Sequence, residues 1–196
     1  MAYKVILGGV AVALGLISNI PYYAAVLRKR VHPHIFTWLI WGITNAITFF
    51  AQFSSNAQAG AWATGTGTFS CFGIVLLGLR YGEKNITRGD WITLAIILAA
   101  IPLWMICKTP LYSVLLITGM DMLGYYPTLR KSWNDPYGES VFAYSLGVVG
   151  LALSVLAITD YSLVNWIYPT CVTAGSTVLI GTLLIRRTVK SAVKEL

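Results

Sequence analysis

The sequence predicts an all-α integral membrane protein with seven transmembrane helices, arranged as two parallel three-helix bundles joined by a linker helix. Three observations lead to this prediction: an apolar composition, seven apolar segments and an internal repeat. Of the 196 residues, 57% are hydrophobic and 11% are charged, whereas an ordinary soluble domain has roughly 25% charged residues. Seven spans of about 20 residues each use roughly 140 residues, which leaves only short loops.

Seven continuous apolar segments are each long enough for a helix that crosses a bilayer at a tilt. They cover residues 5–27, 35–53, 59–79, 91–107, 110–128, 141–159 and 163–185. The fourth is the shortest, and only Lys108, Thr109 and Pro110 mark its boundary with the fifth. The first follows Lys4 in the manner of a signal peptide but is too long for one. We expect it to be a true helix.

The lysines and arginines predict the orientation of the chain. One set of loops carries only Lys4 and Lys108, and the opposite set carries all the other basic residues. These are Arg28, Lys29, Arg30, Arg80, Lys84, Arg88, Arg130, Lys131, Arg186, Arg187, Lys190 and Lys194. The positive-inside rule places this side in the cytoplasm, the N-terminus outside or in a lumen, and the C-terminus in the cytoplasm. We interpret the net charge of +7 as membrane-flanking anchors, which excludes nucleic acid as a partner.

The chain resembles itself after a shift of 103 residues. This shift places Tyr22 on Tyr125 and Pro33 on Pro136, and it superimposes the third apolar segment on the seventh. The predicted units are therefore residues 1–84, a linker helix in 85–108, and a second unit in 109–196. Three crossings invert the chain, so the linker helix restores the orientation of the second unit. Parallel repeats of this kind are a transporter architecture, with the solute path between the halves.

This layout resembles the PQ-loop superfamily, which includes SWEET sugar transporters, cystinosin-type carriers and KDEL receptors. The residues that carry the resemblance are Pro21-Tyr22, Pro127-Thr128 and the loops LRKRVHP and LRKSWNDPYGES. Neither copy contains the Pro-Gln dipeptide itself. The pattern Trp38, Trp41, Asn45 is also similar to bacterial nicotinamide riboside transporters. The resemblance implies transport of a small solute by alternating access.

Polar residues are costly inside a bilayer, so their positions indicate where a solute passes. Helical spacing places Trp41 and Asn45 on one face of the second segment, and Asp121 and Tyr125 on one face of the fifth. The predicted substrate-binding residues are Asn19, Trp41, Asn45, Asp121, Tyr125, Asn165 and Thr170. Pro21 and Pro127 are the predicted hinges because proline frees a backbone carbonyl and kinks a helix. Tyr22 is the predicted gate partner.

Asp121 is the only acidic residue well inside a predicted span, where it costs about 2.5–3.5 kcal/mol on insertion scales. Three hypotheses follow. Asp121 is a proton-coupling carboxylate, a direct acceptor for substrate hydroxyl or ammonium groups, or a structural group bonded to Tyr22, Tyr125 or Asn19. The 103-residue shift places Asp121 on Ser18, so the two halves differ at this position.

Other classes fit the sequence less well. The chain contains no protease, esterase or paired-carboxylate motif, so we expect no enzyme activity and no cofactor. His32 and His34 lack companion ligands, so we expect a solvated loop there and no metal site. A KDEL-receptor-like sorting protein needs a basic luminal pocket, and the outer halves of the predicted spans hold no Lys or Arg.

The predicted partners are the lipid bilayer and a neutral or zwitterionic solute. The polar residues of the predicted path are hydroxyl-, amide- and aromatic-rich, which favours a sugar, a nucleoside or vitamin precursor, or an amino acid. The sequence leaves open whether the protein forms a homo-oligomer.

Overall fold

The protein is described by a computed structural model that covers residues 2–54, 59–106, 109–157 and 163–194. These residues form seven helices and no strand. The helices are α1 (Ala2–Leu27), α2 (Ile35–Ser54), α3 (Ala59–Tyr81), α4 (Arg88–Ile106), α5 (Pro110–Asn134), α6 (Val141–Ala157) and α7 (Leu163–Lys194). All seven predicted helices are confirmed, and α4 and α5 are separate.

Two helices continue well past their predicted ends. The α5 helix ends at Asn134 and α7 ends at Lys194, whereas the apolar segments end at residues 128 and 185. The added turns carry charged side chains, which lower the hydropathy without breaking the helix. One consequence is that Asp121 lies near the middle of α5.

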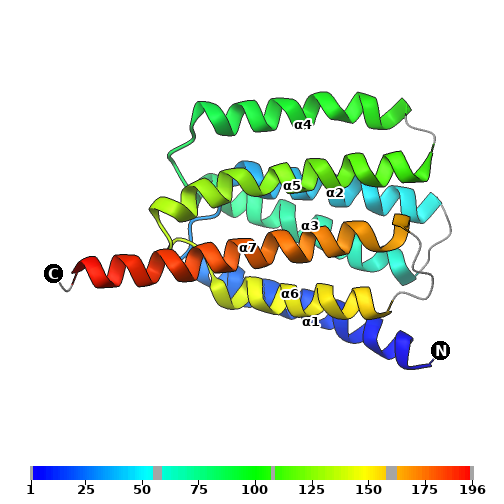
Figure 1. Cartoon of the computed structure of the whole chain (residues 1–196), viewed down its shortest axis with the longest axis horizontal. Helices are drawn as coiled ribbons and strands as arrows, with labels where there is room; N and C mark the ends of the chain where they lie inside the picture. Colours follow the sequence, from blue (N-terminus) through cyan, green and yellow to red (C-terminus); the bar gives the residue numbers. More distant parts are fainter. Residues whose placement is uncertain (1, 55–58, 107–108, 158–162, 195–196) are drawn as a thin grey trace.

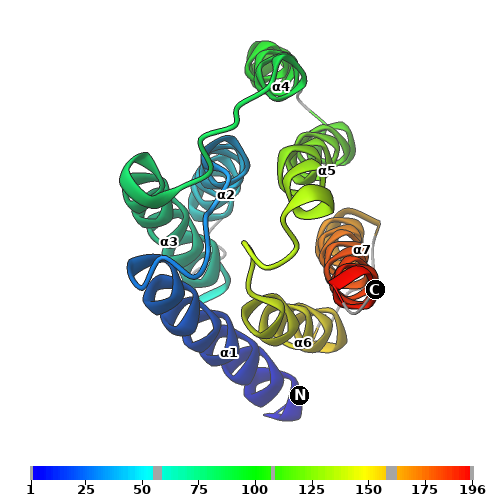
Figure 2. The same ribbon diagram turned by 90° about the vertical axis from the view of Figure 1, so that its left-hand side faces the viewer.

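The helices α1, α3, α2, α5, α7 and α6 pack in that order into a closed ring, which is visible along the bundle (Figure 2). In the first unit α3 packs between α1 and α2, and in the second unit α7 packs between α5 and α6. The two units meet where α1 packs on α6 and where α2 packs on α5. The α4 helix lies outside the ring against α5, and the N- and C-termini lie at opposite ends of the molecule (Figure 1). The neighbour order is therefore the same in both units.

A pair of tyrosine contacts defines the register between the two units. The Tyr23 hydroxyl donates to the backbone carbonyl of Ser70 on α3, and the Tyr125 hydroxyl donates to that of Val172 on α7. In each pair the two residues are 47 positions apart in the sequence. The two contacts are therefore equivalent, and the distance from Tyr23 to Tyr125 gives a repeat of 102 residues. The predicted shift of 103 is therefore wrong by one residue in these helices, and Tyr125 corresponds to Tyr23 instead of Tyr22.

Each of these tyrosines lies over a glycine of the helix that it contacts. A Cβ atom added at Gly73 would meet the Tyr23 hydroxyl, and one added at Gly175 would lie 2.9 Å from a ring carbon of Tyr125. Gly73 and Gly175 have the same spacing as the tyrosines. The same close approach of a ring to a helix backbone is therefore built into both units.

Two helices in the described part of the chain are long and apolar enough to cross a membrane, judged by length and composition. They are Arg88–Ile106 and Trp166–Ala192, and shorter apolar helical segments lie at Val12–Leu27, Ile35–Thr48 and Val141–Leu153. Soluble monomers rarely expose large contiguous apolar patches. Exposed large side chains on α4 are Trp91, Ile92, Ile96, Leu98, Leu103, Met105 and Ile106. This surface is consistent with membrane association.

One end of the bundle, here called the basic end, carries the α1–α2, α3–α4 and α5–α6 loops and the last turns of α7 (Figure 1). There α1 ends in a Schellman motif, with Lys29 in the left-handed region at φ 55°. The Arg30 amide donates to the Ala25 carbonyl and the Lys29 amide to the Val26 carbonyl, which is the bonding pattern of that motif. This turn fixes the direction of the α1–α2 loop.

The close approach of Tyr125 to α7 predicts a difference between two glycines of one helix. Gly175→Ala should lower the stability of the protein by about 1–3 kcal/mol, because the new methyl group overpacks the ring. Gly181→Ala is the matched control because no atom lies within 4 Å of its added Cβ. It should be neutral or stabilising by up to about 1 kcal/mol. Thermal unfolding of the purified variants in one detergent measures both, and equal melting temperatures would contradict the contact.

Candidate functional site

Asp121 is buried at the contact between the two units, with 2% of its surface exposed. Its carboxylate accepts a hydrogen bond of 2.6 Å from the Thr44 hydroxyl of α2 and another from the Tyr168 hydroxyl of α7. Among the described residues, the ion pairs involve Asp90 and Glu139 and none involves Asp121. Asp121 is therefore a buried carboxylate that is held by hydroxyl groups from both units.

Aromatic side chains surround this carboxylate. The indole N–H of Trp41 donates to the Asp121 backbone carbonyl at 3.3 Å. The Trp41 ring meets Tyr125 edge-on, with centroids 4.7 Å apart. The Tyr125 hydroxyl lies 2.7 Å from that of Ser176. The structure therefore brings together three predicted residues, Trp41, Asp121 and Tyr125.

A row of rings leads from this site to the basic end. Trp41 packs on Trp38 with centroids 5.2 Å apart, and Trp38 packs on Tyr22 at 4.9 Å. The Trp38 N–H donates to the Tyr22 hydroxyl at 3.1 Å. Tyr22 also meets Tyr144 of α6 edge-on. The row links α2, α1 and α6 through buried side chains.

The row ends at a buried ion pair. Lys131 and Glu139 lie 2.5 Å apart and are both almost fully buried. The second carboxylate oxygen of Glu139 accepts a hydrogen bond of 2.9 Å from the Tyr22 hydroxyl. We call Tyr22, Trp38, Lys131 and Glu139 the polar lock. It joins the first unit to the second at the basic end, and it contains the predicted gate residue Tyr22.

Further contacts close the same end. Lys131 also donates to the backbone carbonyl of His32 in the α1–α2 loop. The His32 amide donates to the Gly138 carbonyl in the α5–α6 loop at 2.9 Å. The Thr128 hydroxyl donates to that of Thr37 at 2.9 Å. The two loops that follow α1 and α5 therefore bind each other directly.

The interpretation of the basic residues as membrane-flanking anchors needs correction for Lys131, Arg186 and Arg187. Lys131 is buried in the polar lock rather than exposed to lipid headgroups. Arg186 donates to the Trp133 carbonyl, and Arg187 donates to the carbonyls of Pro136 and Glu139. The last carbonyl groups of a helix have no hydrogen-bond donors within that helix. Arg186 and Arg187 supply donors to such carbonyls at the end of α5 and to carbonyls of the α5–α6 loop. This bonding also explains why α7 continues to Lys194.

The expectation of a solvated His34 is wrong. His34 is fully buried, and its Nε2 lies 3.4 Å from Asp90 at the start of α4. Asp90 accepts two hydrogen bonds from Arg130, at 3.0 and 2.8 Å, and one from the Thr87 amide at 2.7 Å. Burial lowers the pKa of His34 to about 4. A neutral His34 therefore packs against the ion pair that attaches α4 to α5.

Besides Trp41, the hydrogen bonds found for Asp121 involve none of the other predicted site residues that the structure describes. The Asn45 side chain donates to the Trp41 carbonyl of its own helix, and its oxygen faces Gly67 of α3. Asn19 donates to the Gly15 carbonyl of its own helix. Thr170 lies two residues from Tyr168, which is about 200° around a helix, so it faces away from the site. The side chain of Asn165 lies outside the described residues.

The contact-based register changes the counterpart of Asp121. A shift of 102 residues places Asp121 on Asn19 instead of Ser18. The two units therefore carry a carboxylate and its neutral amide analogue at equivalent places. The predicted hinges, Pro21 and Pro127, both lie inside continuous helices.

Sequence reasoning missed Thr44, Tyr168 and Glu139. Thr44 lies three residues after Trp41 and therefore shares its helix face. This spacing could have predicted Thr44 as a site residue. Tyr168, Val172 and Ser176 lie on one face of α7 at intervals of four, but the identity of their partner depends on how α5 packs on α7. Glu139 lies in a charged loop, and no pattern indicates that it is buried.

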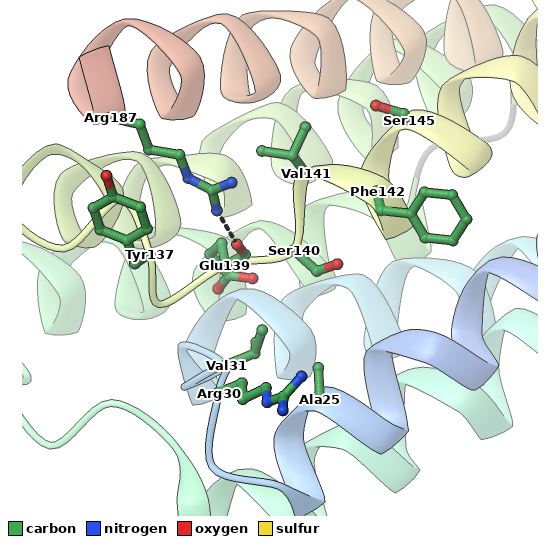
Figure 3. A pocket seen from close by; sticks show the side chains of 10 residues that line it. All are labelled: Ala25, Arg30, Val31, Tyr137, Glu139, Ser140, Val141, Phe142, Ser145 and Arg187. Atoms are coloured by element: carbon green, nitrogen blue, oxygen red, sulfur yellow. Dashed lines mark hydrogen bonds between the residues drawn. The ribbon is translucent and has the colours of Figure 1, made fainter. Parts of the chain in front are cut away.

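A pocket of about 550 Å³ lies at the basic end, away from Asp121. It is lined by residues of α1, α6 and α7 and of the α1–α2 and α5–α6 loops (Figure 3). The described residues contain no group of three or more His, Cys, Asp or Glu side chains that could hold a metal ion. Comparison with family models, curated proteins and solved structures found no match to this chain.

The burial of neutral His34 predicts a specific pH dependence of stability. An unfolded histidine titrates near 6.5, and His34 in the folded protein titrates at about 4. Between these values the unfolded chain binds a proton that the folded chain does not, so stability falls as the pH is lowered. His34→Gln should flatten this dependence by up to about 1.4 kcal/mol per pH unit.

Thermal unfolding of the purified protein between about pH 6.5 and 4 checks this prediction. His32→Gln is the matched control because His32 is in the same loop but only half-buried. It should keep the wild-type slope. A His34→Gln variant with the same slope as the wild type would show that His34 does not contribute.

Proposed function

We propose that this chain is a multi-pass membrane transporter that moves a small neutral or zwitterionic solute by alternating access between its two three-helix units. The observation that carries the proposal is the buried Asp121 carboxylate at the α2–α5 contact. It has hydroxyl partners from both units and, among the described residues, no cationic partner. An ionisable group at such a depth in a membrane helix is costly and is generally retained for function.

The proposed topology has seven spans, the N-terminus outside or in a lumen, and the C-terminus in the cytoplasm. Seven helices in a bundle, with the termini at opposite ends (Figure 1), support an odd number of crossings. The apolar outer surface of α4 suits lipid. The concentration of Lys and Arg at the basic end supports a cytoplasmic location for that end.

The proposed cycle is a rocking motion of the two units around Asp121. The arrangement of the basic end represents the state that is closed to the cytoplasm, because the polar lock and the loop contacts join the units there. Opening this end breaks the bond from Tyr22 to Glu139 and the bond from Lys131 to the His32 carbonyl, while the Lys131–Glu139 pair stays within the second unit. Pro21 and Pro127 lie close to these bonds in the sequence, and each weakens the helix that would bend.

The groups around Asp121 suit particular substrates. The Asp121 carboxylate accepts hydrogen bonds from hydroxyl or ammonium groups, and the rings of Trp41 and Tyr125 supply apolar contact. Sugars, nucleosides and amino acids combine these features. A nicotinamide riboside-type vitamin precursor is the alternative substrate, because it adds an aromatic ring that can pack on Trp41. Proton binding by Asp121 would couple transport to a pH gradient.

Uptake into liposomes that contain the purified full-length chain tests the function. Labelled sugars, nucleosides including nicotinamide riboside, and amino acids are screened at two pH values. Asp121→Asn should abolish accumulation driven by a pH gradient but keep solute exchange, because the amide fills the same space and cannot bind the proton. Glu83→Gln, in the α3–α4 loop, is the control that neutralises a carboxylate away from the path.

Two results would count against this proposal. If no solute of these classes is bound or moved by the wild type, the transport function is wrong. If Asp121→Asn keeps full accumulation driven by the gradient, coupling through this carboxylate is wrong, while transport itself stands.

A further inference from the structure

The pocket at the basic end lies on the seam where α1 of the first unit meets α6 of the second (Figure 3). Its volume of about 550 Å³ falls within the usual range for small-ligand sites. Arg30 lines it from the first unit, and Arg187, Ser140 and Ser145 line it from the second. The α1–α6 seam is a part of the molecule that the proposed solute path does not use.

The Arg187 guanidinium is held in a fixed position. It donates to the carbonyls of Pro136 at 2.9 Å and Glu139 at 2.7 Å, and it lies over the Tyr137 ring at 5.2 Å. Figure 3 shows the side chain reaching from α7 to the Glu139 backbone. These partners are carbonyls and a ring, so they orient the cation without neutralising it.

Glu139, the one carboxylate among the described residues that line the pocket, does not balance this charge. Both oxygens of Glu139 are used by Lys131 and Tyr22 in the polar lock. The ion pairs found among the described residues include neither Arg30 nor Arg187. Two guanidinium groups therefore face one pocket with no acidic partner within the described part of the chain.

We infer that this pocket binds a phosphate group at the cytoplasmic headgroup level of the membrane. Guanidinium groups match phosphate oxygens in geometry and charge, and the Ser145 hydroxyl provides a further donor. The apolar wall formed by Val141 and the exposed Phe142 suits the start of an acyl chain. Basic pockets between helices on the cytoplasmic side are known to bind anionic lipid headgroups.

The bound phosphate joins the two units in addition to the polar lock. Arg30 belongs to the loop of the first unit, and Arg187 belongs to the second. The ligand therefore stabilises the arrangement that is closed at the basic end. This inference rests on the proposed membrane location, but it does not require that Asp121 binds a solute.

The test uses the purified full-length chain in a neutral detergent and four added probes. These are short-chain phosphatidylglycerol, short-chain phosphatidylcholine, glycerol phosphate and inorganic phosphate. The readouts are the melting temperature and the lipid retained in native mass spectrometry. Phosphatidylglycerol should raise the melting temperature more than phosphatidylcholine, because a ligand that binds the folded state stabilises it.

Arg30→Gln is the informative variant because Arg30 is exposed and its loss should not disturb folding. It should weaken phosphatidylglycerol binding about tenfold, which corresponds to the loss of about 1.4 kcal/mol. Arg28→Gln is the matched control because Arg28 is an exposed neighbour that does not line the pocket. It should bind as the wild type does.

Each outcome bears on the inference. An Arg30-dependent shift with phosphatidylglycerol alone supports a lipid phosphate, and the same shift with glycerol phosphate or inorganic phosphate supports a free one. Equal losses in Arg30→Gln and Arg28→Gln mean that anions bind the basic surface in general, which overturns the site. The absence of any shift with all four probes also overturns it. Failure of solute uptake leaves this test unaffected.

Discussion

The buried pair of Lys131 and Glu139 is the interaction on which the closed basic end depends. Charges taken out of water are costly unless each is paired and its remaining hydrogen-bonding capacity is used. Here Lys131 bonds Glu139, the Gly138 carbonyl and the His32 carbonyl, and Glu139 also accepts from Tyr22. Removal of one partner from such a pair costs about 3–5 kcal/mol. Both charges belong to the second unit, and the bonds to Tyr22 and to the His32 carbonyl tie the pair to the first unit.

The aromatic row connects Asp121 at one end to the Lys131–Glu139 pair at the other. Trp41 touches the backbone of Asp121, and Tyr22 touches the carboxylate of Glu139, with Trp38 between them. A displacement of α2 against α5 at Asp121 therefore moves side chains that contact the polar lock. Asn19 occupies the place of Asp121 in the first unit and donates to the Gly15 carbonyl of its own helix. The ionisable Asp121 therefore lies at the α2–α5 contact between the units, and its neutral counterpart Asn19 lies on α1.

The helices were predictable because long apolar segments separated by charges leave few alternatives. The ends of α5 and α7 were not, because hydropathy falls at Arg130 and Arg186 while the helices continue and their basic side chains bond nearby carbonyls. Trp41, Asp121 and Tyr125 were predictable from spacing on single helices. Tyr168, Lys131 and Glu139 act through contacts between distant segments, and charged residues at a loop are usually solvated. Only the packed structure distinguishes a buried loop carboxylate from an exposed one.

The central claim is that Tyr22 and the Lys131–Glu139 pair hold the two units together at the basic end. The most direct measurement is a spin-label distance in lipid bilayers between exposed positions 28 and 134, one in each unit. The wild type should give one narrow distribution. Tyr22→Phe removes the hydroxyl that bonds Glu139 across the units and should add longer distances. Tyr23→Phe removes a hydroxyl that bonds Ser70 within one unit and should not. Identical distributions for Tyr22→Phe and the wild type would contradict the account.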